Sequence, residues 1–403
     1  MKRARGFKNL VADGVDATTS LVRATHDSVR DRIDRVAAWT GPLAAPVRTV
    51  TRVEKASADF VYDCVLATNR LVQTSLEIAL SREADRVPGE TEEAVIAALN
   101  GVVGDHLARR GNDLDLRMSV RHEGREVDPA ALATLGDGKK ICVFVHGLAC
   151  SDAFWRGAPG GPPSFAEALR PSGWTSVFLR YNSGRPVAVN GEALASLLDP
   201  LHCAARIVLI GHSMGGLVAR SAVISAAGKG RRWLRPTTDV ICLGTPHHGA
   251  PLEKLGNVLT AVLGAIDVPA TQVIATVLNA RSLGIKDLRF GTVTEADWGG
   301  ASVDAVLSNR KRPHPWPDTI TPHFIASTWA RDPDRVMAQL VGDSLVRPPS
   351  ATAVGGPDAR RVPLWEVEGT VLGGISHVAL GHHHEVFRRI DEVLNPERSA
   401  GPE

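Results

Sequence analysis

The sequence predicts an α/β protein whose central sheet is mostly parallel. Short runs that are apolar on both faces alternate with stretches of helical character, a pattern typical of a parallel sheet covered by helices on both sides. The runs are Ile141–Gly147, Thr175–Tyr181, Arg206–Gly211, Asp239–Thr245, His323–Thr328 and Pro363–Gly369. The third run leads into Gly-His-Ser-Met-Gly and then into a helical pattern, which places a serine where a buried strand ends.

Length and composition set the class of protein. The chain has 403 residues, of which 44% are hydrophobic and 22% charged, so it can bury a core and is neither disordered nor fibrous. Its net charge of +2 lacks the basic excess that nucleic-acid binding requires. We therefore predict no nucleic-acid partner; no oligomeric state follows from the sequence.

The first part of the chain, residues 1–103, predicts a helical extension. Apolar residues recur every three or four positions in Leu10–Trp39 and in Asp59–Leu80. A short helix over Glu92–Asn100 is expected to stop at Gly101. The two long helices either pack on the rest of the protein as a hairpin or lie on a lipid, granule or partner surface. Basic residues near the start would help the second arrangement, namely Lys2, Arg3, Arg5 and Lys8.

A second domain, which holds the predicted sheet, is expected over residues 104–396. It opens with alternating residues around Glu123-Gly124, which predict an antiparallel hairpin. The polar stretch 397–403 predicts a flexible tail.

Cysteine usage and the N-terminus point to the cytoplasm. The cysteines are odd in number and widely spaced, which predicts buried free thiols in a reducing compartment; they are Cys64, Cys142, Cys150, Cys203 and Cys242. No secretion signal and no membrane-spanning helix are expected, because charged residues interrupt the apolar stretches. Peripheral contact with a membrane stays open.

Ser213 is the candidate nucleophile. Gly211 and Gly215 flank it at two residues, as a sharp turn from strand to helix requires, because a side chain at either position would collide with the facing backbone. A serine hydroxyl needs a base, and the oxyanion formed on attack needs fixed donors. The backbone N–H groups of Leu148, after the strand that ends in His146-Gly147, and of Met214 are the expected donors.

The base is expected after the last strand. His377 stands on a glycine-rich loop, from which an imidazole can reach the serine, and we prefer it to the tract His382–His384 at the start of a helical pattern. That tract could hold a metal, but no cysteine or carboxylate is spaced to complete a site, so we predict neither metal nor cofactor.

The acid is expected after the strand that ends at Thr328. Asp343, in a Gly-Asp turn, is the first choice, and Asp332 and Asp334 are the alternatives.

These residues resemble the alpha/beta-hydrolase superfamily, in its lipase and esterase branch, over Ile141–Leu394. Gly244–Pro251, read GTPHHGAP, is similar to the segment that follows the next strand in bacterial lipases and in PGAP1-like hydrolases. Two further segments resemble a bacterial group of such hydrolases with an N-terminal helical extension, Arg180–Gly191 and Arg281–Trp298. The resemblance carries the acid and histidine roles onto Asp343 in GDSLV and His377 in ISHVAL.

Two departures from relatives stand out. Ala379 replaces the aspartate found two residues after the catalytic histidine in lipases with structural calcium, so the resemblance implies no such calcium site. Ser344 and Arg347 replace residues of the usual Gly-Asp-Gly-Leu-Val-Pro acid loop, which would change the shape of the loop but not its carboxylate.

Leu252–Ala280 is too long and too apolar for a simple connection. It predicts either a helical lid over an acyl-binding cleft or a pair of buried helices. In the first case the lid, or cap, insertion is expected to span residues 252–300.

The expected function is hydrolysis of carboxylic esters with a lipid-like acyl group. The alternatives are an acyltransferase or thioesterase, or a lipid-surface protein that uses the helical extension.

Overall fold

The computed structural model describes residue 72 and residues 90–110, 115–157, 161–250, 282–298, 314–328, 346, 348–352 and 369–399. Several predicted features lie outside these residues. They are the long helices of the extension apart from residue 72, the apolar segment 252–280, the strand expected at 363–369 apart from its last residue, and Cys64.

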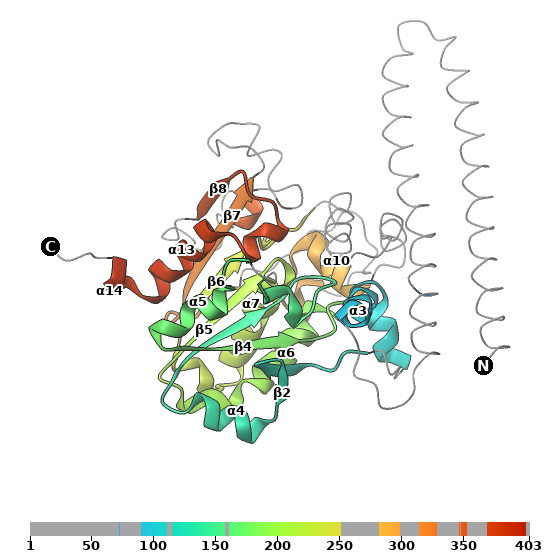
Figure 1. Cartoon of the computed structure of the whole chain (residues 1–403). Coiled ribbons are helices and arrows are strands. Elements are labelled where there is room, and N and C mark those ends of the chain that lie inside the picture. Colours follow the sequence, from blue (N-terminus) through green and yellow to red (C-terminus); the bar gives the residue numbers. More distant parts are fainter. Residues whose placement is uncertain are drawn as a thin grey trace, which may run out of the picture.

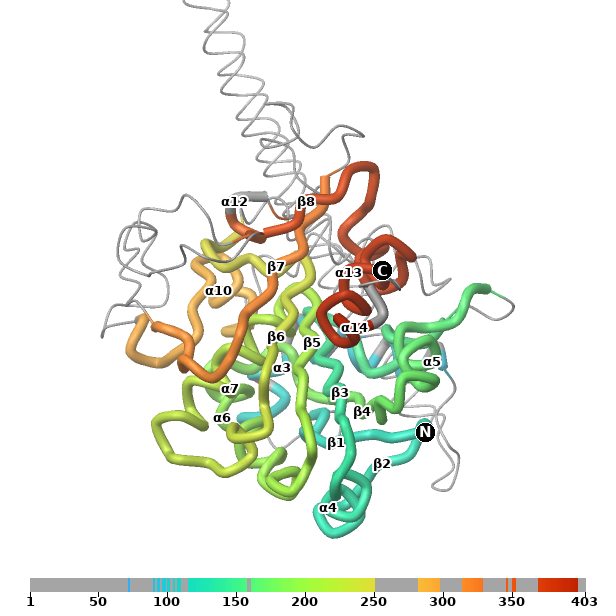
Figure 2. The backbone as a smooth tube through the Cα atoms, turned by 90° about the vertical axis from the view of Figure 1, so that its left-hand side faces the viewer, coloured from blue at the N-terminus to red at the C-terminus, as the bar shows by residue number. Residues whose placement is uncertain are grey.

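An eight-stranded, mostly parallel sheet forms the centre of the protein, as predicted (Figure 2). Its order is β2-β1-β4-β3-β5-β6-β7-β8. The strands are β1 (Ser119–His122), β2 (Arg125–Val127), β3 (Lys140–Val145), β4 (Trp174–Arg180), β5 (Arg206–His212), β6 (Thr237–Leu243), β7 (Thr321–Thr328) and β8 (Thr370–Gly373). All neighbours from β4 to β8 are parallel, whereas β1 pairs antiparallel with β2 and β4.

Helices cover both faces of the sheet. The α-helices are α3 (Glu90–Arg110), α4 (Pro129–Gly136), α5 (Phe165–Leu169), α6 (Val187–Leu197), α7 (Met214–Gly228), α10 (Leu283–Phe290), α12 (Pro348–Ala351), α13 (His384–Leu394) and α14 (Pro396–Ser399). The 3-10 helices are η2 (Asp152–Trp155), η3 (Arg170–Ser172), η4 (Asp199–Cys203), η5 (Arg232–Leu234), η6 (Glu295–Trp298) and η7 (Val378–Gly381). α6, α7 and α10 lie on one side and α5 and α13 on the other (Figure 2).

The two-sided core explains why the strands read as continuous apolar runs. Along β3, Ile141 and Val143 belong to the cluster that includes α6 and α7, while Cys142 and Phe144 belong to the cluster that includes α5 and α13. Successive side chains of a strand point to opposite faces, so both sets must be apolar.

The predicted hairpin is confirmed. β1 and β2 pair around Glu123 and Gly124, which have φ values of 49° and 77°. Two positive φ values in a two-residue turn match the right-handed twist of paired strands.

The expectation that a helix stops at Gly101 is wrong. α3 runs through this residue to Arg110 and lies beside α10 (Figure 1). A Cβ at Gly101 would lie 2.8 Å from the Ala149 Cα, and one at Gly104 would overlap with the Asn182 side chain. These glycines let the helix approach the neighbouring loops closely; they do not end it.

Two of the predicted boundaries fall inside helices. The boundary between residues 103 and 104 falls inside α3. At the other end, Pro396–Ser399 forms a short helical turn, where a flexible tail was expected from residue 397. Pro396 begins that turn, a position that its fixed φ suits.

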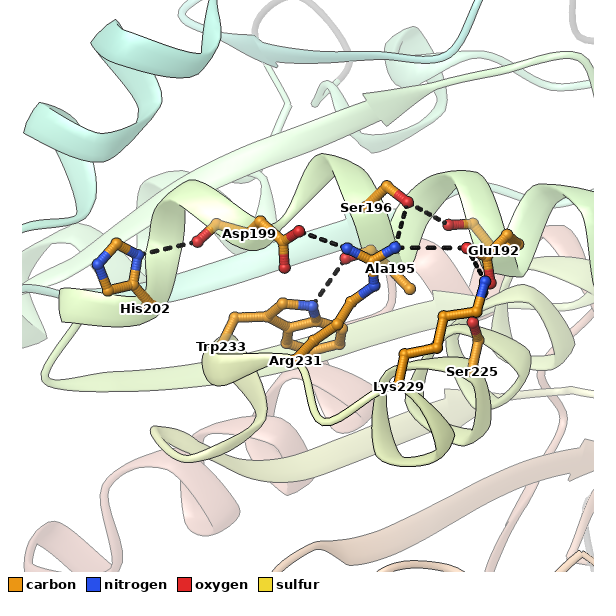
Figure 3. Close-up of polar contacts among 9 residues, drawn as sticks. All are labelled: Glu192, Ala195, Ser196, Asp199, His202, Ser225, Lys229, Arg231 and Trp233. Atoms are coloured by element: carbon orange, nitrogen blue, oxygen red, sulfur yellow. Dashed lines mark hydrogen bonds and ion pairs between the residues drawn. The ribbon is translucent and has the colours of Figure 1, made fainter.

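A polar network on the surface joins α6 to the end of α7 and to η5 (Figure 3). The Glu192 carboxylate accepts hydrogen bonds from Ser225, Lys229 and Arg231. Arg231 also pairs with Asp199 in η4. The Lys229 and Ser225 donors hold the pKa of Glu192 at about 2, below its ordinary value.

The four described cysteines are free, and Cys142, Cys150 and Cys242 are buried as expected. Cys203 is exposed, because it closes η4 at the surface, so the expectation of burial is wrong for this residue. None of the helices in the described ranges has the length and apolar character that crossing a bilayer requires.

Candidate active site

Ser213 is the single residue between β5 and α7. Its backbone has φ 53° and ψ −123°, a conformation that costs a non-glycine residue about 1–3 kcal/mol and persists only where the surroundings impose it. The Ser213 N–H donates a hydrogen bond to the Leu243 carbonyl at 2.8 Å, which ties this turn to the end of β6. The serine is thus held at the carboxyl edge of the sheet, where reactive groups of parallel sheets gather.

The flanking glycines are required by close backbone contacts, as predicted. A Cβ at Gly211 would lie 2.5 Å from the Gly216 Cα, at the start of the helix. A Cβ at Gly215 would lie 2.6 Å from the His146 carbonyl oxygen. Such distances are too short for any side chain, so the turn can form only with glycine at both positions.

The loop after β3 lies against this turn. A Cβ at Gly147 would be 3.1 Å from the Ser213 Cβ. Leu148 and Met214 are both buried, and Met214 is the first residue of α7, where an N–H has no carbonyl one turn earlier in the helix. Among the described residues, none accepts a hydrogen bond from the Leu148 N–H. The two N–H groups expected to bind an oxyanion therefore belong to the two segments that meet at Ser213.

His377 lies beside the same turn. It directly precedes η7, and its ring centroid is 4.9 Å from that of His212. A Cβ at Gly244, the residue after β6, would lie 3.0 Å from the His377 ring. Ser213 and His377 therefore both contact the end of β6, although 164 positions separate them in the sequence, so the fold brings them together.

The acid lies outside the described residues. This holds for Asp343 and also for the alternatives Asp332 and Asp334, so the carboxylate remains an expectation from the sequence.

His212, which the sequence analysis did not single out, packs directly against the candidate base. Its Nε2 is 2.9 Å from the His377 carbonyl oxygen, so Nε2 carries the proton and donates. The His212 ring also stacks on Phe154, with centroids 4.5 Å apart. Burial and the neighbouring His377 hold the pKa of His212 well below its ordinary value, which keeps this ring neutral. A neutral His212 adds no positive charge beside Ser213.

His146 stabilises the start of the loop that follows β3. Its ring stacks on Tyr181 at 4.3 Å, and its Nδ1 donates to the Gly147 carbonyl at 2.9 Å. The Tyr181 hydroxyl donates to the His146 carbonyl. Burial lowers the pKa of His146 to about 4, so this ring is neutral at pH 7 and can keep the Nδ1–H that fixes the Gly147 peptide.

The histidine tract has a structural place. His383 caps α13 by accepting from the Glu385 N–H, and the His382 ring contacts Phe154 at 5.1 Å. Within the described ranges, no three His, Cys, Asp or Glu side chains are grouped so as to hold a metal ion.

Comparisons with known proteins agree with this architecture. Residues 193–326 match the family described as PGAP1-like alpha/beta domain, a segment that contains β5, Ser213, β6 and most of β7. No curated protein matches the chain.

Three solved structures illustrate the structural neighbours. Lipase BlEst2 of Bacillus licheniformis is 18% identical, with 69% of this chain and 97% of that chain covered and a TM-score of 0.41. A putative lipase of Acinetobacter baumannii AYE is 12% identical, with 79% and 100% covered and a TM-score of 0.39. The RedJ thioesterase of Streptomyces coelicolor is 17% identical, with 66% and 91% covered and a TM-score of 0.36. At these values none of the three assigns a substrate or a residue role to this chain.

The predicted resemblance is confirmed at the level of fold and family match. The strand order with an antiparallel start, the strained serine between β5 and α7, and the match over residues 193–326 agree with one another. The chain has the alpha/beta-hydrolase fold, and its residues 193–326 are similar to the PGAP1-like alpha/beta domain.

Proposed function

We propose that this protein is a serine hydrolase that cleaves carboxylic esters through Ser213, His377 and Asp343. The observation that carries the proposal is the strained turn at Ser213 with the His377 ring beside it at the end of β6. Strained backbone conformations cluster at active sites, where the surrounding structure holds them, and this supports a functional role for Ser213.

The chemistry follows from these positions. The Ser213 hydroxyl attacks the ester carbonyl carbon while the His377 imidazole takes its proton. The carbonyl oxygen becomes an oxyanion that the N–H groups of Leu148 and Met214 stabilise. The tetrahedral intermediate collapses, the alcohol leaves with the proton from His377, and the acyl group stays on Ser213. Water, deprotonated by His377, then releases the acid, and Asp343 holds the imidazole in the required tautomer throughout.

The proposed substrate carries a lipid-like acyl group. The support comes from the sequence of Leu252–Ala280, whose only charged residues are Glu253, Lys254 and Asp267 and which follows the strand next to Ser213. Apolar segments of this kind line the clefts that take acyl chains. The proposed compartment is the cytoplasm, in keeping with the free thiols of the four described cysteines.

The test replaces the nucleophile. We expect Ser213→Ala to lose turnover of p-nitrophenyl butyrate by roughly 10⁴-fold or more, and to lose labelling by a fluorophosphonate probe, because the Ser213 hydroxyl is the proposed nucleophile. Ser221→Ala is the matched control, since Ser221 is a buried serine two turns further along the same helix. The control should keep both signals. Labelling that persists in Ser213→Ala would refute the assignment.

The acyl acceptor is tested separately. Product analysis with and without added alcohols and thiols distinguishes a hydrolase from an acyltransferase, and thioester substrates test for a thioesterase. Free acid as the main product from oxygen esters, in the presence of such acceptors, is the result expected here.

A further inference from the structure

The loop that carries Leu148 is held from outside the catalytic core by α3. Gly101 of this helix lies against Ala149, whose φ is 60°, and the Ala149 N–H donates to the Ser183 hydroxyl at 2.9 Å. Ser183 belongs to the turn after β4, and that turn also contacts α3, since a Cβ at Gly184 would overlap with the Asn100 carbonyl. A strained loop residue is thus enclosed between the helix and the β4 turn.

A chain of ion pairs makes a second connection. Arg180, the last residue of β4, donates two parallel hydrogen bonds of 3.0 Å to the Glu93 carboxylate on α3. Its Nε donates to the carboxylate of Asp152, which is the first residue of η2 and the last of the loop at 147–152. The side chains are little exposed, 14% for Arg180, 22% for Glu93 and 5% for Asp152. Partly buried bidentate pairs of this kind fix geometry as well as charge.

The Asp152 carboxylate is held mainly by Arg180. Arg121 and Arg156 also approach its carboxylate, but each only at 3.5 Å. Among the described residues, Arg180 is therefore the cation that hydrogen-bonds directly to the Asp152 carboxylate. Glu93 fixes where the Arg180 guanidinium lies, and so where the start of η2 and the end of the loop lie.

We propose that Glu93 and Arg180 are positioning residues for the loop at 147–152, through which α3 holds the Leu148 N–H in place for the oxyanion. This inference rests on the proposed function. An oxyanion exists only after attack, so a displaced donor weakens the transition state and leaves the bound ester nearly untouched. Loss of the Glu93–Arg180 pair should therefore lower kcat without raising KM.

The test compares Glu93→Gln with Glu192→Gln in the full chain. Both changes remove one carboxylate from an ion-pair network, but Glu192 lies in the network of α6 and α7, away from the loop. We expect Glu93→Gln to lower kcat for p-nitrophenyl butyrate roughly tenfold with KM unchanged, less than the roughly 10²–10³-fold loss that removal of an oxyanion donor causes. Glu192→Gln should keep the kcat of the unmodified protein.

Arg180→Lys supplies the second variant. A lysine keeps the charge near Asp152 but cannot make the two parallel bonds to Glu93. If the pair acts as one unit, the double variant should lose no more kcat than the worse single variant. Phenylboronic acid, which forms a tetrahedral adduct on a serine hydroxyl, should bind more weakly to each variant by the factor lost in kcat.

The outcomes separate this inference from the function on which it rests. If the unmodified protein neither turns over esters nor takes the fluorophosphonate label at Ser213, the proposed function fails. If it does both, and Glu93→Gln keeps its kcat and its affinity for the boronic acid, the positioning role is overturned. A thermal melt of each variant shows what fraction of it is folded. If kcat falls only in proportion to the folded fraction, the positioning role of Glu93 and Arg180 is also overturned.

Discussion

Ser213 holds its backbone in a strained conformation because its neighbours leave no room to relax. Gly215 packs its α-carbon against the His146 carbonyl, and Gly211 packs against the first turn of α7. The strain is therefore stored by contacts of backbone with backbone, which cannot give way as side chains do. These backbone contacts therefore keep Ser213 in its strained conformation above the sheet.

This packing predicts the outcome of adding one methyl group. Gly215→Ala should lower the free energy of unfolding by about 1–3 kcal/mol and remove most ester turnover, because the strand that faces it cannot move away. Thermal unfolding and p-nitrophenyl butyrate turnover measure the two effects. Gly228→Ala, at the end of the same helix, meets no atom within 4 Å and should leave both unchanged or raise stability slightly. Equal effects of the two substitutions would contradict this account.

The strands of the sheet could be predicted from the sequence, because burial on both faces leaves an apolar run with little ambiguity. The hairpin at Glu123-Gly124 could be predicted for a similar local reason. α3 was predicted too short, since Gly101 is a typical helix end in sequence. Its role is close contact with Ala149, a residue far away in the chain, and no local pattern carries that information.

The ion-pair network of α6 and α7 predicts how stability depends on pH. The pKa of Glu192 is about 2 in the folded protein, below its ordinary 4.5, so the folded state binds fewer protons than the unfolded state between these values. The ionised carboxylate thus stabilises the fold above pH 4.5, and this contribution falls as the pH drops towards 2. Glu192 is 39% exposed, so solvent limits the effect to about 0.2–1 kcal/mol.

Thermal melts between pH 7 and pH 3 of the unmodified protein and of Glu192→Gln measure this effect. The difference in stability should be greatest at neutral pH and shrink steadily below pH 4.5. Glu126→Gln is the control, because Glu126 is exposed and makes no ion pair with another described residue. A difference that stays constant down to pH 3 would show that the network does not act through the Glu192 charge.

For the whole molecule, the sequence indicated the class of fold and the chain order of the candidate residues, but not how the parts depend on one another. Ser213 and His377 could be named because each stands at a strand end that a parallel sheet brings to one edge. The connection from Glu93 through Arg180 to Asp152 could not be named, because its members are 87 and 28 residues apart and follow no motif. Long-range pairs of this kind appear only once the chain is folded.

Because the loop at 147–152 is held by α3, chains shortened before and after this helix test how the whole molecule depends on it. A chain that begins at residue 90 keeps α3, whereas one that begins at 111 loses the Glu93 carboxylate and the buried side chains of Ala97, Ala98 and Leu107. It also loses the Asn100 side chain that accepts from the Leu116 N–H. We expect the first chain to keep the kcat of the full protein and the second to unfold at a lower temperature with a reduced kcat. Because the loop at 147–152 would lack its support, kcat should fall further than the folded fraction does. Equal kcat values per folded molecule for the two truncated chains would show that the loop at 147–152 does not need α3.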